Sequence, residues 1–93
     1  MRVLGLDHGT VRTGVAVSDE TGSIAFPLEQ IPSEPEARLL ARIREIVAEK
    51  KAARIVVGLP RNMDGSCGPA AETVRHFIEK LKASAGIPVV EWD

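Results

Sequence analysis

The spacing of apolar residues changes along this chain of 93 residues, and the change limits the possible folds more than any other feature. Residues 2–7 are mostly apolar, and residues 12–18 alternate between apolar and polar side chains, as in a half-buried strand. A third segment, 23–30, contains Pro27, which is typical of an edge strand. The first third therefore predicts an antiparallel meander with a tight turn at residues 8–10.

Helical spacing begins after residue 33. Ser33 and Glu36 form a capping-box pattern, and an apolar stripe follows at positions 39, 40, 43, 46 and 47. Lys50 and Lys51 then supply cations, which the helix dipole favours at a C-terminus. The next segment, 54–59, is continuous and rich in β-branched residues, which indicates a central parallel strand.

A second helix is predicted over residues 69–83, with Gly86 placed to end it, and a last strand over 87–92. In that strand Trp92 is expected to cover the core. The order of elements is β-β-β-α-β-α-β. This order predicts an α/β fold with one mixed sheet, in which strands 1, 4 and 5 are parallel. The length suits a single domain over residues 1–93.

The composition favours a globular protein, because 44% of the residues are hydrophobic and 27% are charged. With a formal net charge of -1, the chain has no overall basic field of the kind that indicates a nucleic-acid partner. No run of about 18 apolar residues is present, so we expect no membrane span. The single cysteine, Cys67, fits a reducing compartment, and we expect the protein in the cytoplasm.

An acidic residue stands where a buried strand is predicted to end. Asp7 ends the first strand, and Asp93 follows the last one. Because the carboxyl ends of parallel strands share one edge of a sheet, both carboxylates are expected at one rim, where ligands bind. Carboxylates there favour Mg²⁺ or Mn²⁺. Asp7 has a simpler interpretation as a turn residue before Gly9, and this alternative stays open.

Other polar residues are candidates for binding a phosphate at the same rim. Gly9 and Thr10 leave room and expose backbone N–H groups, while Arg12 and Arg61 are placed to neutralise phosphate oxygens. Asn62, in the loop after the fourth strand, is a further candidate for orienting a phosphate. The arginines are equally compatible with plain surface charges, and residues 62–65 with an ordinary turn.

Two motifs together carry a family resemblance. The segments "GLDHGTVRTGVAVSD" (5–19) and "VVGLPRNMDGS" (56–66) resemble the YqgF/RuvX family, described as Holliday junction resolvases and as nucleases for precursor 16S rRNA. The resemblance covers the whole chain and implies a ribonuclease H-like fold. It also implies a metal-dependent nuclease that acts on precursor rRNA or branched DNA, with Asp7 and Asp93 as catalytic metal ligands.

The chain departs from the family pattern after Asp93. Family members continue with a Glu and later supply a further Asp, and this chain has neither. We therefore expect that the domain is incomplete at its C-terminus. A two-metal site needs several oxygen ligands, so activity of the chain by itself is an open question.

Two rival functions belong to different classes. Asp7, Gly9 and Thr10 also resemble the phosphate loop of actin-like and sugar-kinase ATPases, which pair two such domains. The near-neutral charge and the missing acids instead favour a non-catalytic RNA-binding module. An uncovered sheet face or an exposed edge strand predicts self-association as a homodimer.

Overall fold

A mixed sheet in the strand order β3-β2-β1-β4-β5 forms the centre of the computed structural model, which describes residues 1–21, 25–59 and 69–92. The strands β1, β2 and β3 pair antiparallel, whereas β1, β4 and β5 pair parallel. The predicted order and strand directions are therefore confirmed. The elements are β1 (Arg2–His8), β2 (Arg12–Ser18), β3 (Ala25–Pro32), α1 (Glu36–Lys50), β4 (Ala52–Gly58), α2 (Pro69–Ala85) and β5 (Val89–Trp92).

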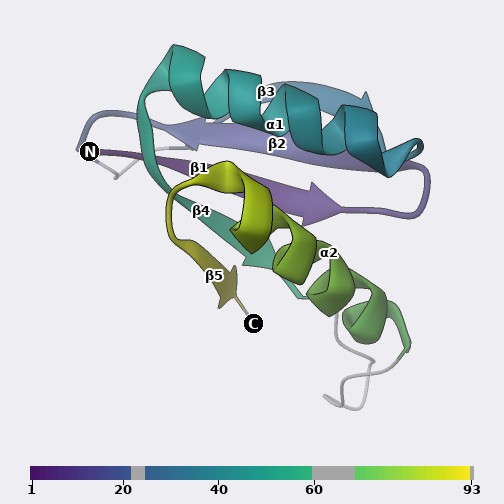
Figure 1. Ribbon diagram of the computed structural model, residues 1–93. Helices are drawn as coiled ribbons and strands as arrows, with labels where there is room; N and C mark the ends of the chain where they lie inside the picture. The colour runs from purple at the N-terminus through teal and green to yellow at the C-terminus, as the bar shows by residue number, and fades with distance from the viewer. Residues whose placement is uncertain (22–24, 60–68, 93) are drawn as a thin grey trace.

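Both helices lie on the same face of the sheet, as Figure 1 shows. Successive side chains of a strand point to opposite faces, so each strand supplies the core with every second residue. The buried apolar side chains of β1 and β2 follow this alternation. Together with the stripes of α1 and α2 they form one hydrophobic core, whose strand residues are Leu4, Leu6, Val15, Val17, Ile31, Ala52, Ile55, Val57 and Val89.

Helix α1 buries the predicted stripe, because Leu39, Ile43 and Ile46 have no exposed surface. It ends at Lys50, and Lys51 follows in the left-handed conformation with its N–H bonded to the Val47 carbonyl. The predicted capping box is wrong: Pro35 is the N-cap residue and no side-chain cap is present. The Ser33 hydroxyl bonds elsewhere, to the β1–β2 turn.

Helix α2 runs two residues beyond its predicted end and is followed by Gly86, whose positive φ of 75° suits a glycine. Strand β5 begins at Val89, two residues later than predicted. The expectation that Trp92 covers the core is wrong, since its side chain is 68% exposed. Trp92 pairs with Gly58 of β4, and this register places it on the face opposite the helices.

Strand β3 lies at one edge of the sheet, as Pro27 predicted. A register shift between Val15 and Ala16 interrupts its pairing with β2. The strand is joined to α1 by Arg42, whose guanidinium donates to both carboxylate oxygens of Glu29 at 2.8 and 3.0 Å. In the described ranges, neither helix is long and apolar enough to cross a membrane.

Candidate active site

The candidate catalytic carboxylate, Asp7, stands near the end of β1 on the face without helices, and it is exposed. Its pairing partner on the neighbouring strand β2 is Gly14. A Cβ added to Gly14 would lie 3.9 Å from the Asp7 Cβ. On the other side Leu6 pairs with Val57, so Gly58 comes one step further along β4, beside Asp7. The carboxylate is therefore flanked by glycines, which leave room for a ligand around it.

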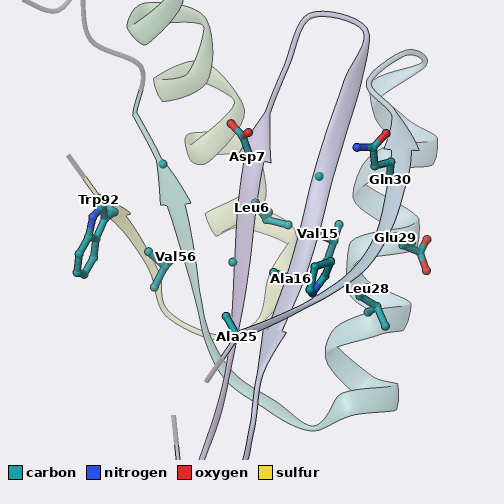
Figure 2. Close-up of a pocket in the computed structure, with 14 residues that line it drawn as sticks. Leu6, Asp7, Val15, Ala16, Ala25, Leu28, Glu29, Gln30, Val56 and Trp92 are labelled. Carbon is teal, nitrogen blue, oxygen red and sulfur yellow. The ribbon is translucent and has the colours of Figure 1, made fainter. Parts of the chain in front are cut away.

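Asp7 forms the rim of a hollow in the open face, with a volume of about 620 Å³ (Figure 2). Its floor has small or apolar residues such as Gly5, Ala16 and Val56. Trp92 of β5 contributes an exposed indole at the margin. The Leu59 N–H donates to the Trp92 carbonyl at 2.8 Å, which holds the end of β5 beside the end of β4. The parallel strand ends therefore meet at one rim, as predicted.

The turn between β1 and β2 adjoins Asp7 and holds the phosphate-binding candidates Gly9, Thr10 and Arg12. The Gly9 N–H donates to the Arg12 carbonyl at 3.0 Å. A Cβ on residue 9 would lie 2.5 Å from that carbonyl oxygen, a distance that only glycine avoids. Thr10 and Arg12 are both exposed. These three residues thus follow Asp7 at the same end of the sheet, but they do not line the hollow.

His8 points to the other face. Its ring stacks on Phe77 of α2 with 4.2 Å between the centroids and 19° between the planes. Burial lowers the pKa of His8, and the nearby carboxylates of Glu36, Glu34 and Asp7 oppose this effect. The imidazole thus anchors the end of β1 to the core, while the neighbouring carboxylate faces the hollow.

The remaining predicted site residues, Asp93, Arg61 and Asn62, lie outside the described residues. Within the part of the chain that the structure describes, no three His, Cys, Asp or Glu side chains are grouped to hold a metal ion. Mg²⁺ and Mn²⁺ bind carboxylate oxygens such as those of Asp7, but each of these ions requires several ligands. The described residues therefore fit part of a metal site.

Comparison with known proteins decides the family. The chain matches the family described as RuvX: Holliday junction resolvase over residues 1–93. The chain belongs to this family. A relative from Thermoanaerobacter pseudethanolicus, provisionally named a pre-16S rRNA nuclease, is 42% identical over 93 residues, which are 100% of this chain and 67% of the relative. The chain spans about two thirds of the length of the curated relatives it matches.

Solved structures confirm the ribonuclease H-like fold. The RuvC structure from Thermus thermophilus aligns with a TM-score of 0.67 at 20% identity, covering 99% of this chain and 63% of that one. A Listeria monocytogenes protein provisionally named an N-acetylmannosamine kinase aligns at 0.55 and 22% identity, covering 98% of this chain and 34% of that one. The fold is thus shared with both classes that the first motif resembles, and the RuvX match favours the nuclease family.

Two residues near the site escaped the sequence analysis of function. The sequence predicts Ser33 as part of a capping box, and it gives no role to Thr13, which falls in the same register as Val15 and Val17. Both are buried and hydrogen-bonded to each other, at 3.0 Å between hydroxyl oxygens. No local motif signals this contact, because the two residues are 20 positions apart.

Proposed function

We propose that this chain carries part of the active site of a metal-dependent nuclease that cleaves structured nucleic acid. One observation supports the proposal most: Asp7 stands between Gly14 and Gly58 at the carboxyl edge of parallel strands, in a chain of the RuvX family. An acid in such a position has free space on both sides for an ion and a phosphate.

The metal-binding role falls to Asp7 together with Asp93, the residue that follows β5 in the sequence. Mg²⁺ or Mn²⁺ held there would supply Lewis-acid stabilisation of the scissile phosphate and a water of lowered pKa. Asp7 would hold the ion on the side of the hollow, because His8 fixes the end of β1 from the other face. This chain spans 67% of the length of such a relative, and the rest of the relative has room for further ligands.

Phosphate binding falls to the turn after Asp7 and to the loop after β4. The Gly9 N–H is bonded to the Arg12 carbonyl, so Gly9 supplies space, while the Thr10 backbone offers an N–H donor and the guanidinium of Arg12 a charged one. Arg61 and Asn62 are proposed to contact the same strand of nucleic acid. These contacts address phosphates, so they hold the substrate in place without reading its sequence.

The substrate we favour is precursor 16S rRNA, with branched DNA as the alternative, because relatives are named for the first and the family for the second. We place the protein in the cytoplasm on the strength of its single cysteine, Cys67. Self-association as a homodimer stays a prediction. So does the interpretation of residues 1–93 as a single domain.

A cleavage assay tests the proposal. Single-stranded precursor 16S rRNA and a four-way DNA junction are incubated separately with the protein and Mg²⁺ or Mn²⁺. We expect one substrate to be cut, and Asp7→Asn to lower the rate by at least about 100-fold, because a metal ion stabilises such a transition state by several kcal/mol. The control variant is Glu79→Gln, which alters an exposed carboxylate of α2 outside the hollow.

Cleavage that persists in Asp7→Asn would remove Asp7 from the mechanism. Absence of cleavage in the 93-residue chain is followed by the same assay on a chain extended to the length of the relatives. If the extended chain is also inactive on both substrates, the nuclease proposal is wrong. Metal-independent binding of RNA by both chains would then favour the RNA-binding module.

A further inference from the structure

Two buried hydroxyl groups lie behind the phosphate-binding turn, and the proposed chemistry does not use them. Thr13 of β2 is fully buried and Ser33, between β3 and α1, is 5% exposed. We call Thr13 and Ser33 the hydroxyl pair. Buried hydroxyls need partners, and the hydrogen bonds of this pair lead directly to the turn at residues 9–12.

The direction of these hydrogen bonds follows from a count of protons. The Ser33 hydroxyl donates to the Gly9 carbonyl at 2.6 Å, which uses its only proton. The Thr13 hydroxyl must therefore donate to the Ser33 Oγ, at 3.0 Å. The Ser33 backbone N–H also donates to the Val11 carbonyl at 2.9 Å. Ser33 thus holds two carbonyl groups of the turn, and Thr13 fixes the orientation of Ser33.

The orientation of one carbonyl determines that of the next amide. The cis peptide bond found in the described residues is Glu34–Pro35, so the bond between Gly9 and Thr10 is trans. In a trans peptide the C=O and N–H groups point in opposite directions. Because the Gly9 carbonyl points inward to Ser33, the Thr10 N–H points outward. Thr10 is exposed, and among the described residues its N–H has no hydrogen-bond partner.

We propose that the hydroxyl pair consists of positioning residues that aim the Thr10 amide at a phosphate of the nucleic acid. The inference deepens the proposed function and rests on it for the identity of the substrate. Outward backbone N–H groups are donors for phosphate oxygens, and they bind best when the backbone is already fixed. The pair acts through the turn and does not itself touch the substrate.

The chain offers a matched control at the opposite end of the same strands. Ser18 is a third buried hydroxyl, 8% exposed, which accepts from the Val3 N–H at 2.8 Å and donates to the Asp19 carbonyl at 3.0 Å. Ser18→Ala removes as many hydrogen bonds as Ser33→Ala, but far from the turn. A purely structural role for Ser33 predicts that the two variants behave alike.

The experiment titrates the ¹⁵N-labelled 93-residue chain with a 12-nucleotide single-stranded RNA and follows the Thr10 amide signal. We expect a clear shift of that signal in the wild-type protein and in Ser18→Ala. In Ser33→Ala the shift is lost and the affinity for RNA falls roughly tenfold, since one hydrogen bond to a charged group contributes about that much. Thr13→Val gives a smaller loss, and Thr13→Ser, which keeps the hydroxyl, restores the binding.

The outcomes separate this inference from the proposed function. The inference is wrong if the Thr10 amide signal of the wild-type protein does not shift when RNA is added. It is also wrong if Ser33→Ala binds RNA as tightly as Ser18→Ala does. Either result overturns the inference even if RNA is cleaved. A Thr10 shift that depends on Ser33 supports it, even if cleavage fails and the nuclease proposal falls. A loss in Thr13→Ser equal to that in Thr13→Val also contradicts it, because the hydroxyl would then be irrelevant.

Discussion

On the face of the sheet that α1 and α2 cover, each strand contributes at least one buried apolar side chain, such as Leu4, Ile55 or Val89. On the other face the same strands contribute Gly14, Gly58 and other residues that line the hollow. Because successive side chains of a strand point to opposite faces, one face can pack a core while the other stays open. The covered face stabilises the fold through burial of apolar surface, and the open face leaves space for chemistry at Asp7.

The largest expected effect is a difference in stability between alanine variants of two adjacent valines of β4. Val57 is fully buried under the helices, while Val56 lies in the floor of the hollow. We expect Val57→Ala to lower the free energy of unfolding by about 2–3 kcal/mol, since it removes buried methyl groups and leaves a cavity. Val56→Ala is expected to cost less than about 1 kcal/mol. Urea denaturation at several protein concentrations measures both.

Equal losses of unfolding free energy in the two valine variants would contradict the difference between the two faces. Such a result, if it depended on protein concentration, would mean that a second copy covers the open face, as the homodimer prediction requires.

An intermediate effect is expected from Gly9, in the turn that follows β1, and from Gly14, which lies beside Asp7. Gly9→Ala places a methyl group 2.5 Å from the Arg12 carbonyl oxygen, so the turn must shift, at about 1–3 kcal/mol of stability. Gly14→Ala makes only an ordinary contact with Asp7, so stability stays within about 0.5 kcal/mol. That methyl group still narrows the space around the carboxylate, and we expect severalfold weaker Mn²⁺ binding. Thermal unfolding and Mn²⁺ titration distinguish the variants, and unchanged Mn²⁺ affinity in Gly14→Ala would contradict the role of the glycines.

The smallest effect concerns the edge strand. Hydrogen bonds from Arg42 hold the pKa of Glu29 below its ordinary value of 4.5. The folded state therefore favours the ionised carboxylate. The resulting stabilisation is present above that ordinary value and is lost as the pH falls through the lower pKa of the folded protein. We expect the stability difference between the wild-type protein and Glu29→Gln to shrink as the pH is lowered from 6 to 3, as followed by urea denaturation. A difference that stays constant over this range would show that the ion pair contributes nothing through ionisation.

Much of this architecture could be predicted because it depends on local patterns. The change from strand to helix spacing gave the element order, and the rule for parallel strand ends gave the position of Asp7. The rest depends on pairing between distant segments. Ser33 looked like a helix cap, but its partners Gly9 and Thr13 are 24 and 20 residues away. The face on which Trp92 lies is set by its pairing with Gly58.

The central claim, that the open face holds a metal site at Asp7, is tested most directly with Mn²⁺ and NMR. Bound Mn²⁺ is paramagnetic and broadens the amide signals of nearby residues, whether or not the chain is active. The account predicts selective broadening at Asp7, Gly14 and Gly58 in the wild-type protein, and its loss in Asp7→Asn. Broadening that is absent, or that is centred on the carboxylates Glu20 and Glu49 at the opposite end of β1, would contradict it.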